Sequence, residues 1–482
     1  MINDLDFAAV LPEILLLCGA CAVLLGDLFV GDGRRHVSFW LTQIVLAAAA
    51  WSALATMPPV PRGAFAGMVV DDTLADTLKF MSCVAVSLML FYSRGYSAAR
   101  GLFRGETFVL ALFALLGMMV MIAAGSFVTL YLGLELLSLS LYAMVAMYRT
   151  SNAATEAAMK YFVLGALASG ILLYGMSMIY GSTGSLDIGV VAKTLATGQG
   201  DRTILLFGLV FLVSGVAFKL GAVPYHMWVP DVYDGAPTAV TLLIGTAPKL
   251  AAFAFMLRLL AVALGSLWFD WQGMLMVLAV LSMVLGNVVA IAQTSMKRML
   301  AYSSIANMGF MLMGFLAANP SGYSAAMFYA IAYVLTSLAS FGMIMLLSRE
   351  GFEADQLSDF KGLNQRSPWW AFMMLLVMFS LAGVPPTVGF YAKFAVIQAA
   401  VDAGFVWLAV VAVLTSVVGA FYYLRVVKLM YFDDATDLAP IDARADSRWF
   451  LSANGLALLA FGIFPQQLLG ICVVALANSG LL

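Results

Sequence analysis

Residues 208–228 read GLVFLVSGVAFKLGAVPYHMW, an apolar run that holds one lysine and is interrupted by glycine and proline. The run 375–394, LLVMFSLAGVPPTVGFYAKF, repeats this pattern with Lys393, Pro385 and Pro386. A membrane span requires about 20 apolar residues. A pair of Pro-interrupted spans is typical of membrane proteins with a site near the bilayer midplane. These two stretches therefore predict a helical membrane protein with two broken spans.

The composition of the chain agrees with a location inside the lipid bilayer. Of its 482 residues, 63% are hydrophobic and only 10% are Asp, Glu, Lys or Arg, whereas soluble proteins carry about 25% of such residues. The apolar runs are uninterrupted, which excludes the alternating strands of an outer-membrane barrel. The net charge of −2 is uninformative, but the sequence has no basic patch of the nucleic-acid type, so we expect no nucleic-acid partner. We therefore expect an all-α polytopic membrane protein.

The division into spans follows from the Gly, Pro, Asn and charged residues that separate the apolar runs. We predict fourteen spans, at residues 7–27, 37–57, 75–93, 107–124, 126–147, 156–180, 203–229, 237–262, 272–293, 299–318, 323–348, 369–400, 404–430 and 449–475. An even number places both termini on one side of the membrane. Lys and Arg concentrate in the loops on the other side, and only Arg62, Lys193, Arg202 and Arg258 fall on the side of the termini. The positive-inside rule therefore predicts that both termini lie outside the cytoplasm.

Once the basic residues of loops and helix ends are set aside, five lysines remain within the predicted spans, and these lysines and Glu135 single out a candidate site. The set is Glu135, Lys79, Lys160, Lys219, Lys249 and Lys393. A charge near mid-membrane costs at least about 2.5–3.5 kcal/mol on insertion scales, so it requires a partner, water or a function. Lys79 follows Asp76 near the outer end of its span, and we expect its side chain to snorkel to the interface. Apart from Lys160, the other charges lie too deep to snorkel, which favours a function for them.

Two residues near this set have open alternatives. Lys160 lies about one turn inside its span and four residues after Glu156, so it either forms a surface ion pair or belongs to the buried set. His226 follows Pro224 and titrates near neutral pH. It is either a proton relay or an interfacial histidine beside Trp228.

The deep lysines have a chemistry that needs no cofactor. Burial favours the neutral amine, whereas a nearby carboxylate favours the ammonium. A lysine balanced between these effects can load and release a proton. A change in the distance between Glu135 and Lys219 would then switch the proton affinity of the lysine, as a proton pump requires.

The broken spans also predict an internal repeat. They are the seventh and the twelfth spans. Because they are five spans apart, which is an odd number, they cross the membrane in opposite directions. We therefore expect two inverted five-helix repeats, each with a Pro-broken helix. The predicted division is 1–105 for three N-terminal helices, 106–262 for the first repeat, 270–432 for the second, and 433–482 for a cytoplasmic loop and a last helix.

Several long motifs resemble those of one membrane-protein family. They are LGLELLSLSLY (132–142), FKLGAVPYHMWVPDVYDGAPTAVT (218–241), QTSMKRMLAYSSIANMGF (293–310) and SLAGVPPTVGFYAKF (380–394). Together they resemble the antiporter-like membrane subunits of respiratory complex I, over almost the whole chain. Three features are most similar to the N-type subunits. The chain has fourteen predicted helices without a long lateral helix, the seventh helix exits as VPDVYDGAPTAVT, and Lys249 stands where L- and M-type subunits typically have histidine.

The resemblance implies roles for the matching residues. Glu135 and Lys219 would form the pair of the fifth and seventh helices, and Lys249 would be the central connecting lysine. Lys393 would serve the outward half-channel, and Lys160 matches a sixth-helix lysine of relatives. Proton translocation would be coupled to NADH oxidation and quinone reduction in other subunits.

The resemblance also implies a location and partners. We expect a bacterial cytoplasmic (inner) membrane, an M-like antiporter subunit on one side, a K-like small subunit on the other, and the lateral helix of an L-like subunit. FMN, iron–sulfur clusters and quinone would belong to other subunits. Cys18 and Cys21 have no histidine or second cysteine pair nearby, so we expect no metal site in this chain.

One other class of function shares the same sequence features. A subunit of a multi-subunit cation/proton antiporter would have the same helices and lysines. A purely structural spacer is a poorer interpretation, because it leaves the deep charges unexplained.

Overall fold

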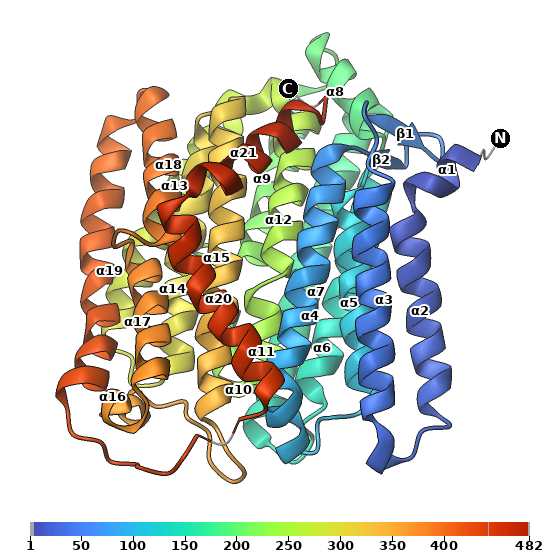
Figure 1. The fold of residues 1–482 in the computed structure, drawn as a ribbon. Helices are drawn as coiled ribbons and strands as arrows, with labels where there is room; N and C mark the ends of the chain where they lie inside the picture. The colour runs from blue at the N-terminus through green and yellow to red at the C-terminus, as the bar shows by residue number, and fades with distance from the viewer. Residues whose placement is uncertain (1–3, 442, 481–482) are drawn as a thin grey trace.

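The computed structural model describes residues 4–441 and 443–480 as a bundle of roughly parallel helices (Figure 1). The first three residues of the predicted region 1–105, and residues 442, 481 and 482 of the region 433–482, lie outside the described residues. Figure 1 places α1 and the end of α21 at the same end of the bundle, which we call the terminal face. The other end is called the opposite face.

The helices and strands have the following bounds. They are α1 Asp4–Ala9, α2 Leu11–Asp27, η1 Asp32–Arg34, α3 His36–Ala55, β1 Arg62–Ala64, β2 Val69–Asp71, α4 Thr73–Ala99, α5 Gly105–Ile122, α6 Phe127–Ala146, α7 Asn152–Thr183, α8 Ile188–Ala196, α9 Arg202–Leu220, α10 Trp228–Gly235, α11 Thr238–Gly245, α12 Pro248–Met256, the π-helix η2 Leu257–Ala263, η3 Gly265–Leu267, α13 Trp268–Ile291, α14 Met296–Leu316, α15 Pro320–Leu347, η4 Leu357–Phe360, α16 Leu363–Arg366, α17 Pro368–Ala382, α18 Val388–Asp402, α19 Val406–Phe432, α20 Ala445–Ile463 and α21 Pro465–Ala477.

The number of helices that can cross a membrane bears on the prediction of fourteen spans. Within the described residues, eleven helical segments are long and apolar enough, and there are twelve if α20 and α21 form one span. The predicted spans that do not qualify alone are the first, the twelfth and the fourteenth. In the first, α2 has only 17 residues, and the twelfth is divided into two helices of 15 residues each. The polytopic helical fold is confirmed, and the number fourteen stays a prediction.

The last predicted span, 449–475, is bent where we expected a continuous helix. Its two halves, α20 and α21, meet at an angle of 83°. Pro465 opens α21 and cannot donate the backbone hydrogen bond that would continue α20, and it also restricts the residue before it. The turn therefore falls at Phe464.

Both predicted broken helices are interrupted. The first breaks between α9 and α10, and the second between α17 and α18. Glycine ends the first half in each case, because Gly221 and Gly383 adopt left-handed conformations with φ of 77° and 83°. These breaks leave the last carbonyl groups of α9 and α17 without partners in their own helix.

A third interruption lies in the predicted eighth span and was not expected. The helix α11 ends at Gly245 and α12 begins at Pro248, so Lys249 stands directly after a break. Farther along, η2 widens the same helix into a π-helix. The sequence signal was the pair of a glycine and a proline three residues apart.

The centre of the bundle is formed by α14 and α15. In each, 94% of the most apolar window is buried. The helix α15 packs against α14 and α18, and also against α11 and α12. It therefore joins the helices that carry Lys249 and Lys393.

Candidate functional site

Glu135 and Lys219 lie on α6 and α9, and each is hydrogen-bonded to a different serine. The hydroxyl of Ser169, on α7, donates to Glu135 Oε1. Lys219 Nζ donates to Ser138 Oγ over 3.0 Å, and Ser138 stands one helical turn after Glu135 on the same face of α6. Among the ion pairs of the described residues, none joins Glu135 directly to Lys219.

Lys219 and Lys249 line a common internal cavity. Its volume is about 40 Å³, and its walls include Ser138, Tyr161 and Trp228. A single water requires roughly 10–15 Å³ of such space, so the cavity has room for a few waters. The hydrogen bonds of the two amines go to other groups, Lys219 to Ser138 and Lys249 to the carbonyl of Leu220.

The break of α9 provides the partner of Lys249. Its ammonium donates to the carbonyl oxygen of Leu220, the last residue of α9, over 3.0 Å. The carbonyl of Phe218, two residues earlier in α9, accepts from the indole nitrogen of Trp228 at 2.9 Å. The C-terminal end of a helix carries partial negative charge, and here a buried lysine meets it.

Lys393 repeats this arrangement at the other broken helix. Its Nζ donates to the carbonyl oxygens of Leu381 and Ala382, at 2.9 and 3.0 Å, where α17 ends. It also donates to Ser416 Oγ on α19 at 3.0 Å and lies 4.9 Å from the ring centre of Phe310. The side chain is buried, so these groups replace the hydration of the amine.

A polar network that the sequence analysis missed runs beside Lys393. A small cavity next to the lysine is lined by Asn307 and Tyr329. Tyr329 Oη donates to Asn307 Oδ1 at 2.6 Å, and Asn307 Nδ2 donates to Ser303 Oγ at 3.2 Å. Ser303 in turn contacts Tyr423 Oη. The available signal was the spacing of Ser303 and Asn307, which lie four residues apart in an apolar helix.

Lys160 lies apart from the deep lysines, at the opposite face. Its side chain is 43% exposed and pairs with Glu156 at 2.8 Å and with Asp231 at 2.7 Å. Asp231 also pairs with Arg298 of α14 at 3.1 Å. Burial opposes ionisation of Asp231, but the hydrogen bonds from Lys160 and Arg298 outweigh it and hold the pKa of Asp231 below its usual range. Lys160 therefore forms the predicted surface pair with Glu156, and it also binds Asp231 of α10, which follows the break of the helix.

His226 lies within the break between α9 and α10 and is partly buried. It does not line the cavity that Lys219 and Lys249 share. A role as relay therefore has no support from this cavity, and it stays a prediction.

Known proteins resemble this chain over nearly its full length. Residues 124–419 match the family described as NADH:quinone oxidoreductase/Mrp antiporter, TM. NADH-quinone oxidoreductase subunit N of Thiobacillus denitrificans is 60% identical over 98% of both chains, and that of Nitrosomonas europaea is 58% identical over 98% of both. The chain belongs to the subunit N family of NADH-quinone oxidoreductases.

Solved structures support this membership. A chain of respiratory complex I from Thermus thermophilus with bound Aureothin has a TM-score of 0.82 and 32% identity, over 97% of this chain and 100% of that one. A chain of the Mrp complex from Dietzia sp. has a TM-score of 0.84 over 99% and 98%, with 21% identity. The second likeness shows a shared fold only. The expectation of a complex I subunit of the N type is confirmed.

The prediction that Lys79 snorkels is wrong for this member of the subunit N family. The side chain is fully buried, and its ammonium lies 2.9 Å from Glu13 of α2 and 3.4 Å from Asp76. The position near the helix end was misleading because α2 and the β1–β2 hairpin cover this end of α4. The sequence could not place Glu13, which lies 66 residues earlier.

Two other basic residues, which we counted among those in loops or at helix ends, are also buried. Arg258 is 1% exposed and pairs with Asp72, the N-cap of α4, at 2.8 Å. Lys297 is 4% exposed and donates to the carbonyl oxygen of Ala236 at 2.8 Å. Both stand at helix ends that neighbouring helices cover, which the sequence pattern does not reveal.

A metal site finds no support in the part of the chain that the structure describes. Within residues 4–441 and 443–480, no three His, Cys, Asp or Glu side chains come together as a metal ion requires. Cys18 and Cys21 are exposed free thiols on α2.

Proposed function

We propose that this chain conducts protons through the membrane arm of an NADH-quinone oxidoreductase along Glu135, Lys219, Lys249 and Lys393. As a member of the subunit N family, the chain is a membrane subunit of a proton-translocating oxidoreductase. The observation that carries the proposed route is the cavity shared by Lys219 and Lys249 at the break of α9. Redox chemistry belongs to other subunits, with FMN, iron–sulfur clusters and quinone.

The proposed mechanism uses one buried amine to load the next. A protonated Lys219 gives its proton to water in the shared cavity, and the neutral amine of Lys249 accepts a proton from that water. The carbonyl of Leu220 stabilises the ammonium so formed. Ionised Glu135 holds the proton on Lys219, and a loss of that attraction, through movement or protonation of the carboxylate, favours transfer.

The outward step is assigned to Lys393. The helix α18, which carries this lysine, also carries Gln398 and Asp402 on the wall of a hollow of about 580 Å³. Ser321 and Ser324 of α15 line the same hollow. These polar groups on the wall of an otherwise largely apolar hollow support release of the proton toward the terminal face. The polar network of Asn307 and Tyr329 supports its supply from the other side.

The inverted repeats remain part of the proposal, as does the division 1–105, 106–262, 270–432 and 433–482. The breaks read FKLGAVP at 218–224 and FSLAGVP at 379–385, with Phe, Leu, Val and Pro in the same register. Lys249 donates to Leu220 at the first break, and Ser416 contacts the carbonyl of Ala382 at the second over 3.4 Å. In both halves, the helix after the broken helix thus binds its free carbonyl end.

The orientation and the neighbours are proposed on the resemblance and the charge pattern. The basic loops lie at the opposite face, so we assign that face to the cytoplasm and both termini to the periplasm of a bacterial inner membrane. As a subunit of a multi-subunit complex, the chain contacts other membrane subunits. We propose an M-like subunit, a K-like subunit and the lateral helix of an L-like subunit. Lys160 would stand at the cytoplasmic end of the route, and His226 would relay protons near it.

The experiment that tests this function uses the complex purified in mild detergent and reconstituted in vesicles. We expect the chain to co-purify with flavin and iron–sulfur absorbance, and Lys219→Ala to abolish most NADH-driven acidification while the complex stays assembled. Lys193→Ala is the control, because Lys193 is an exposed lysine of α8. Purification without redox cofactors would instead favour a cation/proton antiporter. Normal pumping by Lys219→Ala would refute the route.

A further inference from the structure

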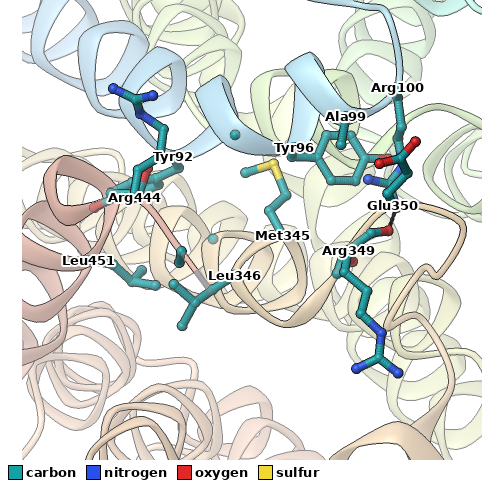
Figure 2. A pocket seen from close by; sticks show the side chains of 15 residues that line it. Tyr92, Tyr96, Ala99, Arg100, Met345, Leu346, Arg349, Glu350, Arg444 and Leu451 are labelled. Atoms are coloured by element: carbon teal, nitrogen blue, oxygen red, sulfur yellow. Dashed lines mark hydrogen bonds between the residues drawn. The ribbon is translucent and has the colours of Figure 1, made fainter. Parts of the chain in front are cut away.

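A hollow at the opposite face lies outside the proposed route. Its volume is about 240 Å³, and it lies between the ends of α4 and α15 and the start of α20. Figure 2 shows the residues around it, among them Tyr96, Arg100, Arg349, Glu350 and Arg444. The arginines already have carboxylate partners, since Arg100 pairs with Glu353 and Arg349 with Asp437. The hollow is therefore suited to water rather than to an anion.

Glu353 does not line this hollow itself, but it contacts two residues of the wall, Tyr96 and Arg100. Its carboxylate accepts from Tyr96 Oη at 2.9 Å and from the hydroxyl of Thr238. The Arg100 guanidinium lies 2.7 Å away, and the backbone N–H of Thr238 donates to Tyr96 Oη. About a quarter of the Glu353 side chain is exposed, whereas Thr238 is fully buried. The carboxylate is thus partly exposed, and it is bonded to two residues of the hollow's wall and to a buried hydroxyl.

The buried side of Glu353, at Thr238, faces the chain segment that binds the amine of Lys297. Thr238 opens α11, in the same span as Lys249, and Ala236 stands two residues earlier. The carbonyl of Ala236 accepts from Lys297 Nζ at 2.8 Å. The carboxylates whose charges act on Lys297 are Glu353, Asp234 and Asp355. Glu353 and Lys297 therefore meet the same three-residue junction, which ends α10 and begins α11.

The segment that carries Glu353 is fixed to the start of α14. The backbone N–H of Met296 donates to the carbonyl of Asp355 at 2.6 Å, and that of Leu357 donates to Thr294 at 2.9 Å. The carboxylate is thus held in place by the backbone on one side and by Arg100 and Tyr96 on the other. A fixed carboxylate between water and a buried amine is the arrangement that proton uptake requires.

We propose that Glu353 takes up protons from the hollow lined by Tyr96 and Arg100 and passes them, through the hydroxyl of Thr238, toward the buried amine of Lys297. In the first step, a proton from water in the hollow converts the carboxylate into a carboxylic acid. In the second, the acid returns to a carboxylate as Thr238 relays a proton inward and a neutral amine becomes an ammonium. This inference rests on the proposed function, for which it supplies an uptake site.

The test uses Glu353→Gln in the complete complex in vesicles, with pumping measured from pH 6 to pH 9. Glutamine keeps an oxygen for Tyr96 and Thr238 but cannot carry the proton. We expect a several-fold loss of pumping that grows with pH, because uptake limits the rate when protons are scarce. Glu353→Asp should restore part of the rate. Glu350→Gln is the matched control, since it removes a glutamate charge from the wall of the hollow itself and leaves the contacts of Glu353 in place.

Each other outcome has a stated meaning. Wild-type pumping by Glu353→Gln at every pH, with Lys219→Ala inactive, overturns this inference and leaves the proposed function in place. An equal loss at every pH together with lower heat stability overturns it too, because Glu353 would then only tie the loop to α4. If the complex with Glu353→Gln does not assemble, the Ala99→Trp variant provides the test of proton uptake. It fills the hollow without touching a charge, so a loss on the alkaline side supports uptake and an unchanged profile refutes it.

Discussion

The ammonium nitrogen of Lys249 lies 3.0 Å from the carbonyl oxygen of Leu220, so the eighth span is tied to the residue at which α9 ends. A helix end turned toward a buried amine stabilises its charged form. The same amine faces a cavity with room for water, from which it can gain or lose a proton. The carbonyl contact suits a role for Lys249 as a fixed charge, whereas the cavity suits a role as a proton carrier.

Replacement of Lys249 by arginine tests this distinction. Arginine keeps the positive charge and can reach the Leu220 carbonyl, but it does not release its proton in proteins. We expect Lys249→Arg and Lys249→Met to lose pumping alike, by at least about tenfold. The measurement is NADH-driven acidification of vesicles that contain the assembled complex. Full activity of the arginine variant would mean that only the charge is needed.

A substitution of Ser138 tests the proposed route more mildly than a substitution of a lysine. Its hydroxyl accepts the hydrogen bond of Lys219 and lines the shared cavity. Ser138→Ala removes one hydrogen bond of about 1 kcal/mol, so we expect pumping to fall by roughly a factor of five. Ser140→Ala is the matched control. Its hydroxyl bonds only to the Leu136 carbonyl of the same helix. Equal pumping rates in the two variants would remove Ser138 from the route.

The deep charges could be found from the sequence, but their partners could not. A lysine or glutamate in an apolar run is rare because its insertion is costly, and so Lys219 and Lys393 were recognisable without a structure. Ser138 lies 81 residues from Lys219 in the chain, and Ser416 lies 23 residues from Lys393. Serines are common in membrane helices and usually bond to their own backbone. No feature of the neighbouring sequence distinguishes Ser138 and Ser416, which bind lysines, from the other serines.

The breaks of the helices were predictable to different degrees. The glycines and prolines at 221–224 and 383–386 marked two of them, since proline removes a helix hydrogen bond and glycine permits the left-handed end. The break before Lys249 carries the same signal at the spacing of Gly221 and Pro224, with Gly245 and Pro248, and yet it was not predicted. The burial of Lys79 and Arg258 depends on which helices cover a helix end, and that is a property of the tertiary packing.

The ion cluster around Lys79 should be important for stability. Its ammonium is shared by Glu13 and Asp76, and all three side chains are buried. Lys79→Ala leaves two carboxylates without a counter-charge, a change that costs about 3–5 kcal/mol for a buried pair. We expect a lower temperature of heat inactivation of the complex, measured against Lys193→Ala. Combining Lys79→Met with Glu13→Gln and Asp76→Asn should restore much of the loss. A fully stable Lys79→Ala variant would contradict the ion cluster.

The loop that carries Asp437 should show a dependence on pH. The backbone N–H of Ala439 donates to this carboxylate at 2.9 Å, and Arg366 and Arg349 lie beside it. These contacts hold the pKa of Asp437 below its usual range. Because the pKa is lowered in the folded state, the stabilisation is complete above the ordinary Asp value of about 3.9 and is lost as the pH falls through the lower one.

Protease cleavage of this loop in the purified complex measures that effect. We expect the cleavage rate to stay constant from neutral pH down to about pH 4 and to rise only below it. Asp437→Asn should raise the rate already at neutral pH, because it removes the charge that Arg349 and Arg366 bind. Asp434→Asn is the control, since Asp434 is an exposed residue of the same loop. If both variants are cleaved at the same rate, the arginine contacts do not hold the loop.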